Sequence, residues 1–140
     1  MTDIQAALGI SQLQRIDEFI SRRRMLATVY NEKLAELPIV LPYQQPDTDS
    51  AWHLYVIKIK QYEDGKSRQQ VFDELRSHNI GVNVHYIPVH TQPYYKALGF
   101  KHGDFPQVEQ YYENIITIPL YYALTVQEQE YVIQCLYKCI

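Results

Sequence analysis

The sequence predicts an α+β domain: a small, mainly antiparallel sheet with helices packed on one face, preceded by a long connector helix. Three segments rich in β-branched and aromatic residues alternate with segments of helical periodicity. Three capping boxes, each a Ser or Thr followed three residues later by Gln or Glu, mark helix starts. The predicted order is helix, strand, helix, strand, short helix, strand, helix. A parallel pair of strands with right-handed crossovers is the alternative topology.

The first helix begins at the box Thr2-x-x-Gln5 and carries apolar residues at three- and four-residue steps until Pro38 stops the pattern. At 1.5 Å per residue, such a helix of roughly 35 residues is about 50 Å long. A domain of this size cannot cover it from end to end, and its start is apolar around much of its circumference. We therefore divide the chain into a connector, residues 1–38, and a small domain, residues 39–140. Part of the connector is expected to pack on something outside these residues.

Residues 52–60 are predicted as the first strand, because they are rich in β-branched and aromatic side chains. Alternation along this strand places four side chains on one face: His53, Tyr55, Ile57 and Ile59. Glu63-Asp64-Gly65 is predicted as a turn. The box Ser67-x-x-Gln70 then opens the second helix, which Asn79 and Gly81 end.

Residues 82–87 are predicted as the second strand. A short helical turn is expected over 94–98, closed by Gly99, and a further short helix from Asp104 and Pro106 to Glu113. Residues 115–119 form the third predicted strand. The box Thr125-x-x-Glu128 opens the last helix.

Composition limits the classes of function. The chain has 140 residues, a net charge of −3 and 46% hydrophobic residues, which fits a single soluble domain. This charge gives no electrostatic case for nucleic acid or an anionic membrane as a partner. No apolar run approaches the roughly 20 residues of a membrane span. The N-terminus lacks the pattern of a signal peptide, so a cytoplasmic location is expected.

The segment NVHYIPVHTQPYY, residues 83–95, is the strongest candidate for a binding site. It holds two His and three Tyr around two prolines, and Pro ends a strand because it has no N–H to donate. Such side chains at a strand-to-loop transition suit a polar, ring-shaped ligand. The alternative for each of these residues is a structural role. His85 would then be a histidine whose hydrogen bonds are satisfied within the sheet, and the tyrosines would pack within the fold.

No catalytic or metal-binding residue is predicted. No Asp or Glu lies between Ile80 and Lys101, and H-E-x-x-H is absent. Cys135 and Cys139 are interpreted as reduced, partly buried thiols, because two cysteines cannot complete a zinc site and no base lies near them in the sequence. No glycine-rich phosphate loop is present.

Three blocks carry a family resemblance: MTDIQAALGISQL, GVNVHYIPVHTQPYYKALGF and ENIITIPLYYALTVQEQEYVI. They resemble the C-terminal third of the DegT–StrS type of nucleotide-sugar aminotransferases, which are pyridoxal-phosphate enzymes of the aspartate aminotransferase fold (fold type I). The resemblance covers essentially the whole chain. Within the family it is most similar to enzymes of the pseudaminic acid pathway type, which aminate C4 of a UDP-linked 4-keto-6-deoxy-hexose.

The resemblance implies that the first helix leaves a large cofactor domain, and that the Schiff-base lysine and the residues holding pyridoxal phosphate lie in that domain. The chain alone is then expected to bind no cofactor and to be inactive, while the complete enzyme is a homodimer using glutamate as the amino donor. The resemblance also implies that the motif His85-Tyr86-Ile87-Pro88 borders the nucleotide-sugar pocket. Within it, Pro88 is expected to hold the turn, and His90 is expected to close the pocket.

Two other classes of function remain open. One is a stand-alone binding or interaction module that uses a Tyr-rich face. The other is a ferredoxin-like regulatory domain that binds a small metabolite. A free-standing module should have a polar first helix, whereas Ile4, Ala7, Leu8 and Ile10 make this one apolar.

Overall fold

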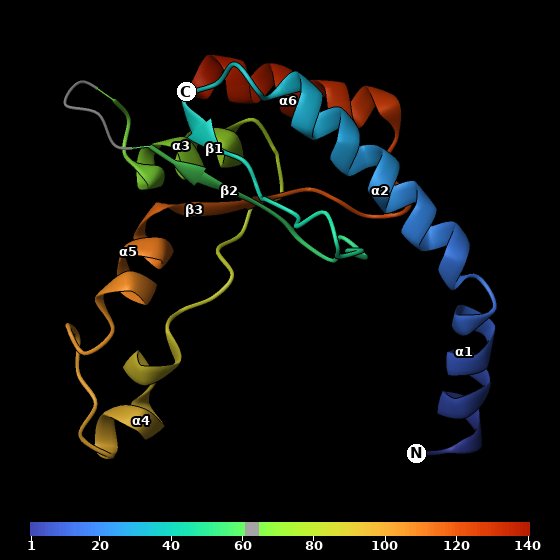
Figure 1. Ribbon diagram of the computed structural model, residues 1–140, viewed down its shortest axis with the longest axis horizontal. Coiled ribbons are helices and arrows are strands. Elements are labelled where there is room, and N and C mark those ends of the chain that lie inside the picture. Colours follow the sequence, from blue (N-terminus) through green and yellow to red (C-terminus); the bar gives the residue numbers. More distant parts are fainter. Residues whose placement is uncertain (61–64) are drawn as a thin grey trace.

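The computed structural model, which describes residues 1–60 and 65–140, confirms the predicted fold class (Figure 1). It contains one three-stranded sheet and several helices. In chain order these are α1 (Asp3–Leu13), α2 (Ile16–Lys33), β1 (Ile39–Val40), β2 (Tyr55–Ile59), α3 (Arg68–Ser77), the 3-10 turn η1 (Val89–Thr91), α4 (Pro93–Ala97), α5 (Pro106–Asn114), β3 (Ile115–Ile118) and α6 (Val126–Cys139). The predicted turn Glu63-Asp64-Gly65 begins with two residues outside the described part of the chain.

The sheet has the order β1-β2-β3 and both pairs are antiparallel, so the parallel alternative is wrong. Tyr55 lies opposite Ile118, and Ile57 lies opposite Ile116. Residues directly opposite each other share a face of an antiparallel sheet. The face that carries Tyr55, Ile57 and Ile59 is buried, as the alternation along residues 52–60 predicts. His53, predicted on the same face, lies outside the strand and is exposed.

The buried face packs against α2, α3 and α6, whose inward residues form one core with it. Tyr30 of α2 is at the centre of this core. Its ring lies 5.0 Å from the ring of Tyr55, and its hydroxyl donates to the carbonyl of Pro119 at 2.8 Å. Gln129 of α6 donates to the carbonyl of Leu26 at 2.8 Å. These contacts fix α2 to both the sheet and α6.

All three capping boxes are present as predicted. Thr2, Ser67 and Thr125 each accept a hydrogen bond from the backbone three residues on, and the side chain of that residue accepts one in return. The boxes satisfy backbone donors that a helix start otherwise leaves unpaired. They therefore set the beginnings of α1, α3 and α6.

The prediction of a single long first helix is wrong, because the helix is interrupted between α1 and α2. The N–H of Arg15 donates to the carbonyl of Gln12, three residues back, and Arg15 has φ −109° and ψ 6°. This tighter turn interrupts the α-helical ladder without Pro or Gly, so no composition signal marks it. The helix also ends earlier than predicted, at Lys33, although Leu34 and Leu37 remain buried.

The second predicted strand, residues 82–87, is also wrong. Only Asn83 pairs with the sheet, through two backbone hydrogen bonds to Thr117 of 3.1 and 2.8 Å. The chain then leaves the sheet toward Pro88, which cannot donate to a ladder. Two further boundaries differ. The strand β2 begins only at Tyr55, and Trp52, where the strand was predicted to begin, has φ +49°, outside the β region. The short β1 lies between the first predicted helix and the first predicted strand, where no element is predicted.

Two parts project from this core. In Figure 1, α1 extends from one end of the molecule, and the segment containing α4 and α5 extends from the other end to the same side of the sheet. We call residues 84–114 the arm. No residue of α1 is buried, and Ile4 is 83% exposed. In the described part of the chain, no helix combines the length and the apolar character that crossing a membrane requires.

Replacing Tyr30 by Phe tests the centre of the core. The substitution leaves the carbonyl of Pro119 without its buried donor, which should cost about 1–3 kcal/mol of unfolding free energy. Urea denaturation followed by circular dichroism measures this cost. The control is Tyr43→Phe, because Tyr43 is exposed. Equal stability of the two variants would contradict the role given to Tyr30.

Candidate functional site

The predicted binding motif, residues 85–88, begins just after Asn83, where the chain leaves its pairing with β3 and enters the arm. Tyr86 and Ile87 are exposed, Tyr86 to 68%, whereas Pro88 is buried. The peptide bond between His85 and Tyr86 is cis. The structure thus presents two of the predicted residues to the surface and uses Pro88 to anchor the turn that precedes η1.

His85 is half-buried and is held by the sheet. Its Nδ1 lies 2.9 Å from Oγ1 of Thr117, and its Nε2 lies 3.4 Å from Nδ2 of Asn83. An amide nitrogen can only donate, so Nε2 accepts and Nδ1 carries the proton that is donated to Thr117. The contact at Nε2 is long and weak. His85 therefore offers an acceptor to a ligand hydroxyl while β3 fixes its ring.

His90 does not lie at the surface with Tyr86. It is 6% exposed, and its Nε2 donates to Oε1 of Glu109 at 2.7 Å. Glu109, which is also 6% exposed, accepts the N–H of Gly103 with both oxygens, at 2.8 and 3.0 Å. His102 lies 3.4 Å from its other oxygen. Glu109 thus ties η1, α5 and the loop between α4 and α5 into one unit.

The charge on Glu109 is favoured by its donors. Burial acts to raise the pKa of Glu109, but the N–H of Gly103, the His90 ring and the nearby His102 outweigh it and hold this pKa below its usual range. The carboxylate is therefore ionised. The sequence did not reveal Glu109, because nothing in the spacing links it to His90 across the intervening loop.

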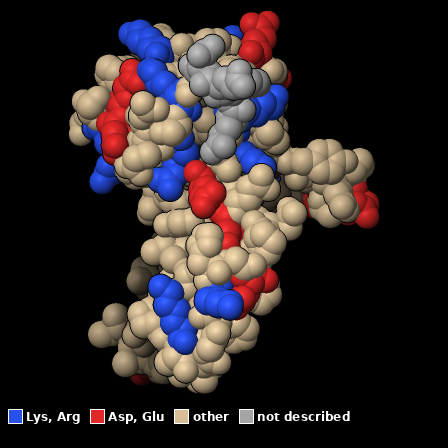
Figure 2. All heavy atoms as spheres, turned by 90° about the vertical axis from the view of Figure 1, so that its left-hand side faces the viewer, with Lys and Arg blue, Asp and Glu red and all other residues tan. Residues whose placement is uncertain are grey.

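An apolar hollow of 350 Å³ opens on the arm beside His90. Aromatic and aliphatic side chains line it: Val89, Tyr95, Phe100, Phe105 and Val108, together with the ring of His90. Figure 2 faces the arm and shows fewer charged side chains on this lower part of the molecule than above it. An exposed apolar surface of this kind is typical of a contact site.

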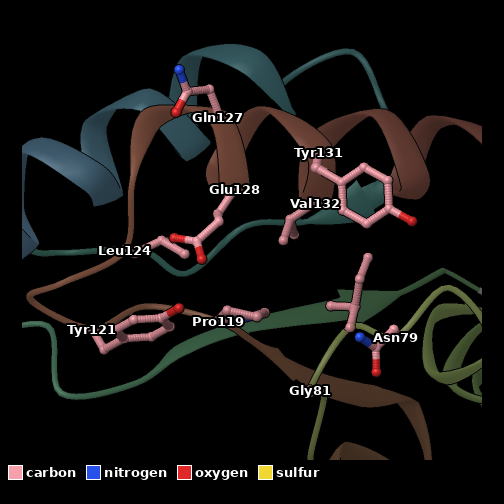
Figure 3. A pocket seen from close by; sticks show the side chains of 10 residues that line it. Asn79, Gly81, Pro119, Tyr121, Leu124, Gln127, Glu128, Tyr131 and Val132 are labelled. Atoms are coloured by element: carbon pink, nitrogen blue, oxygen red, sulfur yellow. The ribbon is translucent and has the colours of Figure 1, made fainter.

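A larger hollow than the one on the arm lies elsewhere. It has a volume of 520 Å³ and lies between the loop after β3 and the beginning of α6 (Figure 3). Polar side chains from Asn79, Tyr121, Gln127, Glu128 and Tyr131 line it. Glu128 is held by the capping box, and Tyr131 donates to the carbonyl of His78. None of the predicted binding residues lines this hollow.

The chain's own residues do not fit pyridoxal phosphate. That cofactor needs a lysine for its Schiff base, held in a pocket, and a cradle of donors for its phosphate. None of the lysines is buried, and none lines a hollow together with His85. They are Lys33, Lys58, Lys60, Lys66, Lys96, Lys101 and Lys138.

Residues 1–137 match the DegT/DnrJ/EryC1/StrS aminotransferase family, and the chain belongs to this family. It is 38% identical over 137 residues to the spore coat polysaccharide biosynthesis protein SpsC of Bacillus subtilis, with 96% of this chain covered. It superposes with a TM-score of 0.90 on the sugar aminotransferase Spr1654 of Streptococcus pneumoniae at 33% identity, covering 99% of this chain. The TM-score with DesV of S. venezuelae, solved with a ketimine intermediate, is 0.86 at 30% identity and 96% coverage of this chain. The chain spans about 35% of the length of each of these relatives.

Glu109→Gln should loosen the arm. The pKa of Glu109 is lowered in the folded chain, so its ionised form stabilises the fold at neutral pH, and this contribution is lost as the pH falls through the folded pKa, below the ordinary value of 4.5. The variant should therefore exchange the Gly103 amide hydrogen faster at neutral pH, and its difference in stability from the native chain should shrink in acid.

Hydrogen exchange by mass spectrometry and acid titration of stability measure these effects. Glu113→Gln is the matched control, because Glu113 lies on the same helix with an exposed side chain. If Glu113→Gln loosened the Gly103 amide as much as Glu109→Gln does, the role assigned to Glu109 would be refuted.

Proposed function

We propose that this chain is the C-terminal part of a pyridoxal-phosphate-dependent aminotransferase that acts on a nucleotide-linked keto sugar, with glutamate as the amino donor. The family match over residues 1–137 carries the proposal. It is supported by relatives that are sugar aminotransferases and by structures of Spr1654 in its pyridoxal- and pyridoxamine-phosphate forms. The sequence resemblance favours a UDP-linked 4-keto-6-deoxy-hexose as the substrate class.

In this proposal the chain supplies a wall of the substrate pocket and no catalytic residue. His85 accepts a hydrogen bond from a sugar hydroxyl through Nε2, or donates to the diphosphate when protonated. Tyr86 presents its exposed hydroxyl beside it, with the two rings 4.5 Å apart. Ile87 adds an exposed apolar contact, and Pro88 holds the turn. His90, predicted to close the pocket, is instead buried and bonded to Glu109, so in this proposal it supports the arm behind the site.

The remaining surface is proposed to meet the missing part of the enzyme. Apolar side chains are exposed on α1 and on the arm, at both projections of the molecule. On α1 they are Ile4, Leu8, Ile10 and Leu13. A cofactor-binding domain preceding this chain would cover them, and a second subunit would complete the homodimer. The chain has only about 35% of the relatives' length, which leaves room for such a domain.

The alternative is a stand-alone interaction module derived from this domain. Such a module should be monodisperse in size-exclusion chromatography, because an adapted surface does not expose a broad apolar patch. The apolar face of α1 favours the domain of a larger enzyme and predicts self-association of the isolated chain. A sharp, concentration-independent monomer peak would favour the module.

The isolated chain should be inactive as an aminotransferase. Pyridoxal phosphate added to it should show no Schiff-base absorption shift, and glutamate with a UDP-linked 4-keto sugar should give no amino sugar. The reason is that no lysine of the chain is buried, whereas a Schiff-base lysine is held in an enclosed site. The full-length enzyme is the positive control. Glutamate-dependent amination by the pure chain would refute this part of the proposal.

In the full-length enzyme, His85→Ala should raise the KM for the nucleotide sugar about tenfold, because a hydrogen bond to a charged group contributes about 1.5–3 kcal/mol. The KM for glutamate should be unchanged. Gln134→Ala is the control, as this exposed residue lies on α6. An unchanged KM for the nucleotide sugar would show that His85 is a structural sheet histidine.

A further inference from the structure

Three side chains with metal-binding atoms meet where the end of α3 packs on the end of α6. Glu74 and His78 are four residues apart on α3, so they lie on the same face of this helix. Cys139 of α6 faces them. One ligand atom of each residue lies within 4.8 Å of the others. This cluster is separate from the arm and from the proposed substrate pocket.

We propose that Glu74, His78 and Cys139 bind a single Zn²⁺ ion, with water as the fourth ligand. Thiolate, imidazole and carboxylate are the three ligand types that proteins use for zinc, and three protein ligands leave one tetrahedral position open. Ligand atoms of a tetrahedral site at bond lengths of about 2.0–2.3 Å are less than about 4 Å apart, so small side-chain rotations bring this cluster to that geometry.

The surroundings of the cluster suit a bound ion. Cys139 is fully buried, so its sulfur is shielded from solvent on the side of the helix core. Zinc binds cysteine as the thiolate, so the thiol proton leaves to solvent as the Zn–S bond forms. Glu74 and His78 are half-buried, so the ion has a route from solvent.

Lys66 is the competing cation. Its Nζ lies 2.5 Å from Oε2 of Glu74, and its side chain is 41% exposed. An ion pair this accessible contributes little to stability, and Lys66 can turn to water. Zinc can therefore displace it at small cost.

The backbone around His78 is already fixed. His78 ends α3, and its carbonyl accepts the hydroxyl of Tyr131 at 3.1 Å. A metal ion here would join the last turns of α3 and α6 and hold them together. No sequence motif marks this site, because packing of two helices that are distant in the sequence brings the ligands together.

Titration of the full 140-residue chain with Co²⁺ tests the proposal, because a cobalt–thiolate bond gives a charge-transfer band in the near ultraviolet. The native chain should show this band at one equivalent, and Zn²⁺ should abolish it. Cys139→Ser should lose the band. His78→Gln and Glu74→Gln should weaken Co²⁺ binding at least about tenfold, as loss of a ligand weakens metal affinity by more than an outer-shell change does.

Cys135→Ser is the matched control, since Cys135 is a buried cysteine of the same helix outside the cluster. It should keep the band. A native chain without the band, or a Cys139→Ser chain that keeps it, would overturn the proposal. Circular dichroism of each variant distinguishes loss of metal from loss of fold.

A second measurement serves if Cys139→Ser does not fold. Alkylation of the native chain, followed residue by residue by mass spectrometry, should become at least about tenfold slower at Cys139 in the presence of Zn²⁺. The rate at Cys135 should change much less. Equal protection of both thiols, or of neither, would contradict zinc binding at Cys139.

Discussion

The antiparallel pairing of β2 with β3 is the constraint on which the rest of the structure depends. Its register places Tyr55 and Ile57 opposite Ile118 and Ile116, and this face collects α2, α3 and α6 around one core. The same register turns Thr117 to the opposite face, where it holds Asn83 by the backbone and His85 by the side chain. A shift of one residue would exchange the two faces. Core and candidate site are therefore positioned by a single pairing.

The molecule is well packed at its centre and exposes apolar side chains on its two projections. Buried aromatic and aliphatic side chains join the sheet to three helices, whereas α1 buries nothing and the arm carries exposed aromatic residues (Figure 1). Within the arm, the carboxylate of Glu109 replaces a hydrophobic core as the organising contact. Under the function proposed above, a cofactor-binding domain would cover these exposed surfaces.

Local signals in the sequence predicted most elements of the fold, whereas contacts between residues distant in the sequence could not be predicted. The boxes at Thr2, Ser67 and Thr125 satisfy backbone donors within a few residues, so they are visible in one sequence. The break at Arg15 has no such signal, and the strand predicted over 82–87 fails because only Asn83 finds a partner. The same limit applies to the sites. His85 was marked by its motif, but its bond to Thr117 and the link between His90 and Glu109 arise from tertiary packing.

Hydrogen exchange of α1 compared with α6 in the isolated chain tests the central claim most directly. A helix of 11 residues without buried side chains is only marginally stable in water. If α1 depends on a domain outside this chain, its amides should exchange at nearly the rate of an unfolded peptide while those of α6 stay protected, and α1 should become protected in the full-length enzyme. Protection of α1 equal to that of α6 in dilute, monomeric chain would contradict the account.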